Sequence, residues 1–390
     1  MRVLHVTPYY APAYEFGGPV QSLERLVAEL SSLGIEQRVV TTNANAGGVL
    51  DVARGWTSRN GVPTKYLPQW RMPYITPSVL PEAHDSARWA DIVHVSGVFY
   101  VPSVLGLSAA RLARKPTVLS IHGALQPVAM QTRQARKQAW LRMFCRLYDD
   151  VGVFVATASH EARAIEDTFG AHRRLAIIPN ATEPVSDAQV IALRATAAFD
   201  PSVIGMIGRL HPIKAVDRVL DAMAVLRRAG LATRLKFAGP IQDLAYRDAL
   251  MKQAEQLGLS SHFELLGPLY GADKLRFYAH CSVLVVASHS ENFGNVVVEA
   301  LNVRTPVVAS RGTPWAELAD LNCGAWVENQ PQSLADAIAP FITSPELRRR
   351  AGEAGRQLVQ SKYTWPTVAR QMVELYDAEI HRHLGATVTS

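Results

Sequence analysis

Short apolar runs alternate with segments of helical periodicity along most of the chain. In the first half, six runs rich in β-branched residues predict strands, and helical patterns such as that of residues 17–34 lie between most of them. The predicted strands span residues 2–10, 36–43, 91–97, 116–123, 151–160 and 173–182. This alternation predicts a parallel sheet with helices on both faces.

The hydrophobic period is lost over residues 177–187, "IIPNATEPVSD", and then restarts. Six more strand candidates follow, at residues 202–210, 233–240, 262–267, 281–288, 305–310 and 323–328. We therefore expect an α/β protein with two Rossmann-like domains, residues 1–185 and 186–365, facing a central cleft. Residues 366–390 read as a long amphipathic helix.

The composition is typical of a soluble, folded protein, with 390 residues of which 48% are apolar and 19% are charged. No run approaches the about 18 apolar residues of a membrane-spanning helix. The N-terminus also lacks the pattern of a secretion signal, so we expect a cytoplasmic location. The cysteines lie far apart without metal-ligand spacing, and we interpret them as buried, reduced thiols: Cys145, Cys281 and Cys323.

The net charge of +6 is unevenly distributed. Residues 92–148 contain no Asp or Glu, but they hold Arg111, Arg114, Lys115, Arg133, Arg136, Lys137, Arg142 and Arg146. Within them, residues 133–147 mix basic side chains with Trp140 and Phe144, which predicts a basic amphipathic helix. Such a helix suits an anionic membrane surface, although a solvated face explains the same pattern.

The stretch 283–310, "VLVVASHSENFGNVVVEALNVRTPVVAS", places two carboxylates between two apolar strand candidates. Its first strand is apolar throughout, as central parallel strands are, and we expect a helix to begin near Gly294. The unpaired amides and the dipole at a helix start bind phosphate. Glu291 and Glu299 can accept hydrogen bonds from a sugar and a ribose, with a diphosphate between them.

Cations for that diphosphate follow an earlier strand, in "GMIGRLHPIKAVD". Arg209 comes directly after the strand end at Gly208, and Lys214 lies at the expected start of the next helix. A guanidinium and an ammonium group commonly bind a diphosphate together. Because the chain contains no Asp-x-Asp, we expect these cations, and no metal, to stabilise a departing nucleotide.

The segments "GRLHPIK", "FELLGPL" and "SHSENFGNVVVEALNVRTPVVAS" together resemble the donor site of family 4 retaining glycosyltransferases of the GT-B fold. In this comparison Glu291 and Glu299 form the Glu-x7-Glu pair, and "FGGPVQSLERLVAEL" and "IPNA" extend the resemblance over the chain. The resemblance implies that Arg209 and Lys214 hold the diphosphate, Glu299 the ribose and Glu291 the transferred sugar. It also implies a C-terminal helix that crosses back to the N-terminal domain.

Further site residues rest on the same resemblance. The catalytic set that it implies is His122, Glu291, Arg209 and Lys214, with His122 facing the donor sugar. Further donor-binding residues are Gly17, Gly18, Leu266, Gly267, Asn292, Phe293, Gly294, Asn295 and Val296. A tight turn explains the two N-terminal glycines equally well. His94 is interpreted as structural or acceptor-lining, and Ala181 and Ala215 stand where the family commonly has glycine.

The implied reaction is metal-independent, retaining transfer of a sugar from a UDP- or GDP-sugar to a glycan or polyprenyl-linked acceptor, in bacterial surface polysaccharide assembly. No separate cofactor and no nucleic acid are expected, and the expected location is cytoplasmic, peripheral on the inner face of the plasma membrane. A nucleotide-sugar 2-epimerase of the same fold and a non-catalytic nucleotide-sugar-binding module stay open as alternatives. An NAD-dependent oxidoreductase is disfavoured because neither half carries G-x-G-x-x-G after its first strand.

Overall fold

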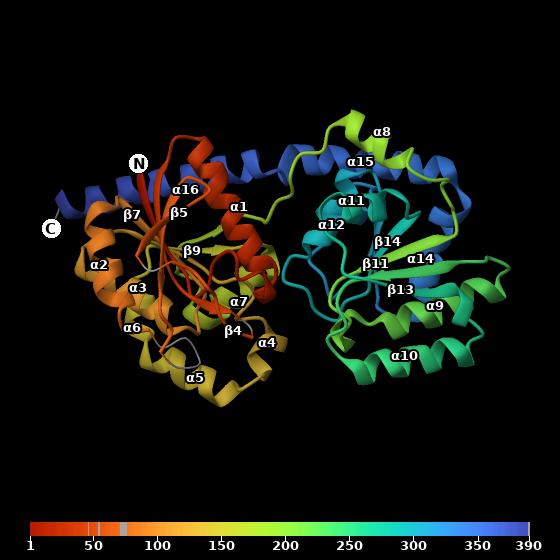
Figure 1. Cartoon of the computed structure of the whole chain (residues 1–390), viewed down its shortest axis with the longest axis horizontal. Helices are drawn as coiled ribbons and strands as arrows, with labels where there is room; N and C mark the ends of the chain where they lie inside the picture. Colours follow the sequence, from red (N-terminus) through yellow and green to blue (C-terminus); the bar gives the residue numbers. More distant parts are fainter. Residues whose placement is uncertain (46, 54, 71–75, 389–390) are drawn as a thin grey trace. The chain divides into compact units, whose positions relative to one another are not determined.

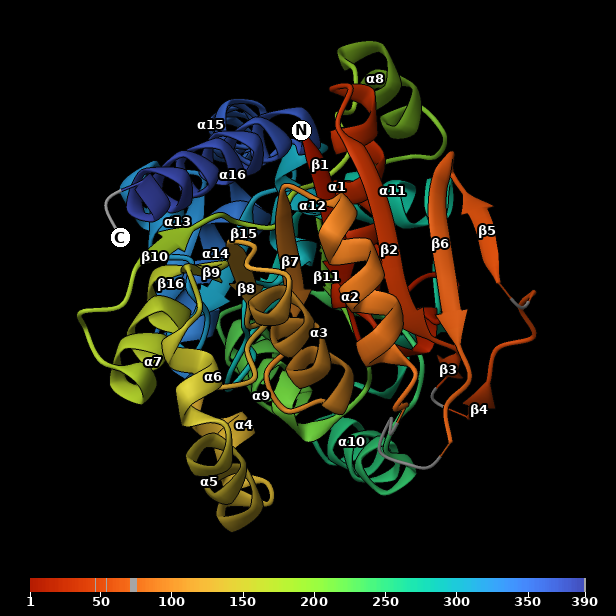
Figure 2. The same ribbon diagram turned by 90° about the vertical axis from the view of Figure 1, so that its left-hand side faces the viewer.

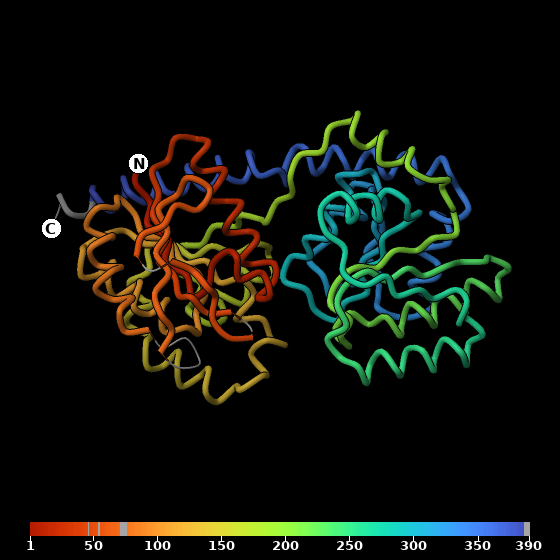
Figure 3. The backbone as a smooth tube through the Cα atoms, in the orientation of Figure 1, coloured from red at the N-terminus to blue at the C-terminus, as the bar shows by residue number. Residues whose placement is uncertain are grey.

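The computed structural model describes residues 1–45, 47–53, 55–70 and 76–388, with side chains up to residue 385. The chain forms two compact units: an N-terminal unit of Met1–Asn180 with Trp365–Ser390, and a C-terminal unit of Ala181–Thr364. The first boundary between the units follows Asn180, five residues before the position after residue 185 that the sequence pattern predicts. The trace in Figure 3 shows the chain leaving the first unit, building the second and returning as the last helix.

The N-terminal unit is built on an eight-stranded sheet of order β10-β9-β8-β7-β1-β2-β6-β5. Its strands are β1 Arg2–Val6, β2 Glu36–Thr42, β5 Trp56–Arg59, β6 Val62–Leu67, β7 Ile92–Ser96, β8 Thr117–Ser120, β9 Val153–Ala156 and β10 Leu175–Ile177. All six predicted strands are present and pair in parallel. The predicted parallel sheet is therefore confirmed for β10 to β2.

One edge of this sheet differs from the prediction. β6 joins β2 in parallel, but β5 pairs with β6 antiparallel, and Figure 2 shows the three strands side by side. Asn60 and Gly61 connect β5 to β6 with φ of 49° and 81°, and Asn-Gly is the strongest short hairpin signal in a sequence. The hairpin was missed because β5 is short and half exposed. A second, separate hairpin joins β3 Ala44–Asn45 to β4 Gly48–Val49.

The helices of the N-terminal unit are η1 Tyr14–Phe16, α1 Gly18–Ser32, α2 Val79–Trp89, α3 Val101–Leu112, α4 Pro127–Gln131, α5 Gln134–Met143, α6 Cys145–Asp149, α7 Ser159–Phe169 and α16 Trp365–Val388. α16 lies against α1, as Figure 1 shows. The prediction of a single helix over residues 133–147 is wrong, because the helix is interrupted at Phe144, between α5 and α6. Among the described helices, none is long and apolar enough to cross a bilayer.

The C-terminal unit has a six-stranded, all-parallel sheet of order β13-β12-β11-β14-β15-β16. Its strands are β11 Val203–Ile207, β12 Arg234–Ala238, β13 Phe263–Gly267, β14 Val283–Val286, β15 Val307–Ser310 and β16 Gly324–Val327. The six predicted strands and the interior place of β14 are confirmed. Helices and turns here are α8 Asp187–Arg194, η2 Pro212–Lys214, α9 Val216–Arg228, α10 Leu244–Gln256, η3 Ser260–His262, α11 Gly271–Ala279, α12 Asn295–Asn302, α13 Glu317–Asp320, α14 Pro331–Thr343 and α15 Pro345–Lys362.

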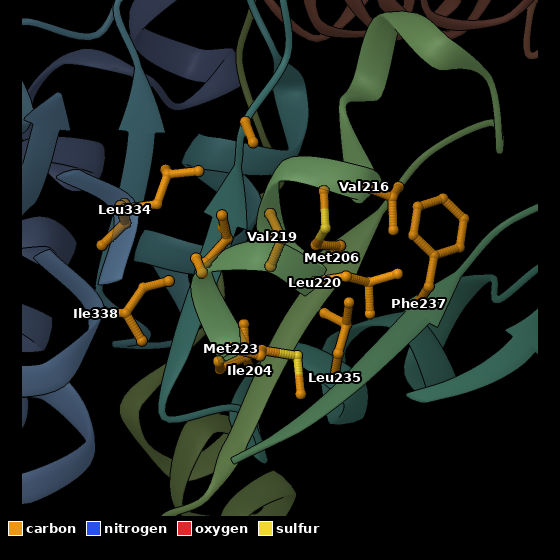
Figure 4. Close-up of a cluster of buried hydrophobic side chains, with 14 of the residues drawn as sticks. Ile204, Met206, Val216, Val219, Leu220, Met223, Leu235, Phe237, Leu334 and Ile338 are labelled. Carbon is orange, nitrogen blue, oxygen red and sulfur yellow. The ribbon is translucent and has the colours of Figure 1, made fainter. Parts of the chain in front are cut away.

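The core of the C-terminal unit fixes β11 from one face of the sheet. Four apolar residues of α9 recur at helical spacing and pack onto side chains of β11, β12 and α14, as Figure 4 shows. The labelled side chains are at most 2% exposed: Ile204, Met206, Val216, Val219, Leu220, Met223, Leu235, Phe237, Leu334 and Ile338. Each such burial stabilises the fold by about 1.5–3 kcal/mol, so the residues that follow β11 start from a rigid support.

Two buried histidines make the stability of the N-terminal unit depend on pH. His5 Nε2 lies 2.9 Å from Gln37 Oε1, and burial lowers its pKa to about 4. His94 contacts Tyr376 Oη and Ser120 Oγ at 2.6 and 2.8 Å, and burial, then His5 and His122, lowers its pKa well below the ordinary value. With both ring nitrogens engaged, His94 is structural.

We expect the free energy of unfolding to fall as the pH drops below about 6.5, because only the unfolded chain then protonates these imidazoles. The expected loss is about 1 kcal/mol per histidine per pH unit, and for His5 it ends near its folded pKa of about 4. Urea unfolding at pH 7 and pH 5.5 measures it. His5→Asn should remove its share of the pH dependence, and an unchanged slope in that variant would contradict the assignment.

The sequence predicts three buried cysteines, but only two of the three lie in the core. Cys281 and Cys323 are buried, but Cys145 is exposed, since it starts α6 beside the uncovered α5. Burial raises the pKa of the Cys281 thiol to about 12 and that of Cys323 to about 11, which leaves almost no reactive thiolate at neutral pH.

A maleimide should therefore modify one cysteine in the native protein and all three in denaturant, counted by intact mass spectrometry. Cys145→Ser should abolish the native modification without changing the melting temperature. Rapid native modification of a second cysteine would show that the core around Cys281 or Cys323 is open.

Candidate functional site

The candidate site lies where β11 and its neighbours end at the carboxyl edge of the C-terminal sheet. Gly208 and Gly239 follow β11 and β12, and their backbones touch so closely that a Cβ on Gly239 would lie 1.7 Å from the Gly208 carbonyl oxygen. Gly239 N–H also donates to the Gly267 carbonyl at 2.7 Å, at the end of β13. The three strand ends are thereby tied together, and the half-buried Leu266 and Gly267 lie beside the loop that carries Arg209.

Lys214 and Glu291, which are 77 positions apart in the chain, meet at this edge. Lys214 Nζ donates to Glu291 Oε2 at 2.6 Å, and Ser288 Oγ donates to the same oxygen at 3.1 Å. Both side chains are about one-fifth exposed, so the pair is partly screened from water. They meet because β11 and β14 are neighbours in the sheet.

The turn before α9 adopts a strained conformation. Lys214 ends η2 rather than starting the helix, and Ala215 follows with φ 49° and ψ 46°. This left-handed conformation explains why the family commonly has glycine at this position. Here Ala215 is fully buried in the core beneath α9. It is the N-cap of α9, which begins at Val216 directly after it.

Glu299 is held by two side chains that the sequence did not point to. In α12, Glu299 Oε1 accepts from Lys274 Nζ at 2.8 Å and Oε2 accepts from Tyr278 Oη at 2.6 Å. Burial, and next the charge of Glu299, raises the pKa of Tyr278 well above its ordinary value, so the phenol remains a donor. Lys274 and Tyr278 lie four positions apart on one face of α11, but only the fold reveals their common partner.

Arg209 is exposed and makes no ion pair with any described residue. The candidate site therefore contains the cations of Arg209, Lys214 and Lys274 and the carboxylates of Glu291 and Glu299. The start of α12 adds the positive end of its dipole. An anion that contacts Arg209 and Lys214 would be electrostatically favoured here.

The loop before α12 is fixed by aromatic packing. Phe293 is buried, with its ring centroid 5.1 Å from that of Trp315 and 5.8 Å from that of Tyr363, so its side chain has a structural role. Gly294 is the N-cap with φ 82°, which confirms the expected helix start. The other predicted donor-loop residues, Asn292, Asn295 and Val296, are half-buried beside it.

In the N-terminal unit, His122 occupies a strained loop after β8. His122 and Gly123 both have positive φ, 54° and 78°. The buried Glu161 accepts from the Gly123 N–H and, at 2.6 and 2.8 Å, from the N–H and hydroxyl of Thr157. Burial lowers the pKa of His122, while Glu161 opposes the shift. A loop in which hydrogen bonds maintain two successive residues with positive φ is typical of functional sites.

Gly17 and Gly18 lie at the start of α1. Gly17 is the N-cap of α1 with φ 86°, and Gly18 is the first residue of the helix. A Cβ on Gly17 would contact no atom within 4 Å, so the backbone conformation alone accounts for glycine at this position. Their contact with a donor stays a prediction.

Comparisons with known proteins identify the family of the chain. Family profiles match residues 16–185, described as Glycosyltransferase Family 4, and residues 194–358, described as Glycosyl transferases group 1. A D-inositol 3-phosphate glycosyltransferase of Nocardia farcinica is 26% identical over 409 residues, covering 98% of this chain and 90% of that protein. One from Jonesia denitrificans is 25% identical and covers 97% and 95%.

Solved structures share the fold. Anabaena HepE in complex with UDP is 20% identical, with a TM-score of 0.76 and coverage of 97% of this chain and 100% of that one. A sucrose-phosphate synthase from Thermosynechococcus elongatus is 19% identical, with a TM-score of 0.72 and coverage of 99% of both chains. With two Rossmann-like units and profile matches that together span most of its length, the chain belongs to family 4 of the glycosyltransferases and has the GT-B fold.

Proposed function

We propose that the protein transfers a sugar from a nucleotide diphosphate donor, UDP- or GDP-linked, with retention of the anomeric configuration. The observation that carries the proposal is the Lys214–Glu291 pair at 2.6 Å beside the exposed Arg209. The HepE structures, which were solved with UDP and with UDP-glucose, support a nucleotide-sugar donor.

Donor binding rearranges an ion pair that the structure already contains. The diphosphate takes Arg209 and Lys214 as partners, and Glu291 turns its freed lone pairs to hydroxyls of the transferred sugar. Glu299 keeps Lys274 and Tyr278 and still has lone pairs for the ribose. The base lies by the backbone of Leu266 and Gly267.

In the transfer step, the bond between the anomeric carbon and the diphosphate oxygen breaks, and the acceptor oxygen bonds to the same face of the sugar. The acceptor proton passes to the departing phosphate oxygen, whose charge is stabilised by Arg209, Lys214 and the start of α12. Metal independence is proposed because Arg209 and Lys214 can themselves supply the positive charge that the departing diphosphate needs. His122 lies in the N-terminal unit, and its contact with the donor sugar stays a prediction.

The stereochemistry is tested by the anomeric configuration of the product, read by NMR from the first turnover. A retained linkage, formed equally well in EDTA, is expected. An inverted linkage would rule out the same-face mechanism, and loss of activity in EDTA that Mg²⁺ restores would rule out metal independence.

Two acceptor classes are proposed. The first is the glycan or polyprenyl-linked saccharide of surface polysaccharide assembly. The second is a phosphorylated cyclitol, which the names of the relatives favour. A panel of both acceptors with UDP- and GDP-sugars, followed by mass spectrometry, separates the two classes.

The same assays distinguish the alternative functions. Donor hydrolysis without acceptor supports a transferase. An altered sugar with free nucleotide indicates the epimerase, and binding without turnover indicates the binding module.

A peripheral membrane location is proposed for the segment α4–α6. α5 has no buried residue, and Met143 at its C-terminal end is 73% exposed among basic side chains. An apolar and cationic helix face binds anionic bilayers. Sedimentation with phosphatidylglycerol vesicles at physiological salt, weakened in Met143→Ser, is expected, and absence of sedimentation would contradict the proposal.

A further inference from the structure

A cavity of the C-terminal unit, about 420 Å³ in volume, lies away from the candidate donor site. It is lined by Ser282, directly before β14, and by Pro306, directly before β15. These residues lie at the edge where the parallel strands begin, whereas Arg209 and Lys214 follow strand ends. The donor site therefore does not account for this cavity.

Arginine dominates the lining of this cavity, which we call the arginine pocket. Four arginines face a single carboxylate there: Arg194, Arg304, Arg348, Arg349 and Glu353. Two of the four are neutralised. Arg304 pairs with Asp187 at 2.9 Å and with Glu353 at 2.8 Å, and Arg349 pairs with Glu346 at 3.0 Å.

The other two arginines have no carboxylate partner among the described residues and instead bind carbonyls at the C-terminal ends of α12 and α14. Arg194 Nη2 donates to the backbone carbonyls of residues 303–304 at 3.1 and 2.8 Å. Arg348 Nη1 donates to those of residues 341–342 at 2.5 and 3.1 Å. In the described part of the chain neither makes an ion pair, and each uses one nitrogen of a group with five N–H donors.

These guanidinium groups are held in place before any ligand arrives. Arg348 lies over the ring of Phe199, 5.2 Å from its centroid, and α15 begins at Pro345 on the cavity wall, with its positive dipole end there. The pKa of Arg194 is lowered first by burial and then by repulsion from Arg304 and Arg348. A bound anion would relieve this repulsion.

We propose that the arginine pocket binds a phosphate monoester, at the edge of the sheet opposite the donor site. The dianion matches the two arginines that lack a carboxylate partner, and the guanidinium fork binds phosphate oxygens in pairs. The cavity volume is within the range of about 300–1,000 Å³ of small-molecule sites. The ester is either a soluble sugar phosphate or the headgroup of phosphatidic acid, since both present the same group.

Isothermal titration of the full chain with glucose 6-phosphate, and with glucose as the uncharged control, tests the soluble source. We expect saturable one-site binding of the ester only. The double variant Arg194→Gln/Arg348→Gln should bind at least about 30-fold more weakly, because two charge-assisted hydrogen-bond donors are lost. Arg350→Gln, an exposed arginine of α15 outside the lining, is the matched control and should bind as wild type.

Thermal unfolding of each variant precedes the titration, and Arg348→Gln alone replaces the double variant if that variant does not fold. Cosedimentation with phosphatidylcholine vesicles, with and without phosphatidic acid, tests the lipid source with the same variants. Binding in either arm that the substitutions weaken supports the pocket. Binding in neither arm, binding that the substitutions leave unchanged, or binding that Lys214→Met abolishes would overturn the proposal.

Discussion

Lys214→Met is expected to lower the rate of sugar transfer, or of donor hydrolysis, by about 10²- to 10³-fold. Lys214 Nζ is the cation that the fold places against Glu291, and its removal leaves Arg209 as the one side-chain cation that the proposal places on the departing diphosphate. Because this contact strengthens as charge develops on the leaving phosphate, most of the loss should appear in kcat rather than in KM for the donor. Initial rates over a range of donor concentrations measure both constants.

Two further variants separate this effect from a structural one. Lys252→Met, on the exposed face of α10, is the matched control and should keep full activity. Lys214→Met also leaves Glu291 half-buried without its cation, so the double variant Lys214→Met/Glu291→Gln shows whether that carboxylate causes the loss. If the double variant regained wild-type kcat, Lys214 would serve only to neutralise Glu291.

Gly239→Ala is expected to destabilise the protein by about 3–4 kcal/mol, the sum of left-handed backbone strain and overpacking. Its φ is 142°, and the new Cβ would lie 1.7 Å from the Gly208 carbonyl oxygen, which is backbone and cannot turn aside. The shift would also displace Arg209, and a displacement of about 1 Å can cost about 100-fold in rate. Urea unfolding and initial rates measure the two effects.

Gly230→Ala is the control for the backbone contribution. Gly230 also has positive φ, 80°, but a Cβ there would meet no atom within 4 Å. This variant should lose only about 1 kcal/mol and keep its activity. Equal destabilisation by both substitutions would show that the contact between Gly239 and Gly208 is not tight.

The twelve strands that the sequence predicts, six in each unit, could be found because each is an apolar, β-branched run flanked by turn residues. β14, for example, is buried at all four positions and lies in the sheet interior. β5 gave no such signal, since its residues alternate between exposed and half-buried at the edge of the sheet. The interruption of the helix at Phe144 was missed because the helical periodicity of the sequence continues across it. The left-handed residue Arg133 before α5 also leaves no signal in the hydrophobic pattern.

The candidate site was predictable as far as it depends on strand ends. Arg209 and Glu291 both follow predicted strands, and ligands of open parallel sheets gather at such ends. No local sequence pattern shows that β11 and β14 are neighbours in the sheet. The contact between Lys214 and Glu291 could therefore be seen only in the structure. The partners of Glu299 were missed because a pairing between two helices, α11 and α12, leaves no pattern in a single sequence.

The most direct test is a crystal structure of the protein with UDP or GDP bound, whichever nucleotide binds more tightly by titration. The account predicts the diphosphate within hydrogen-bonding distance of Arg209 and Lys214, at the start of α12, with the ribose hydroxyls on Glu299. A diphosphate bound elsewhere in the C-terminal unit, with the Lys214–Glu291 pair intact beside it, would contradict the proposed donor site.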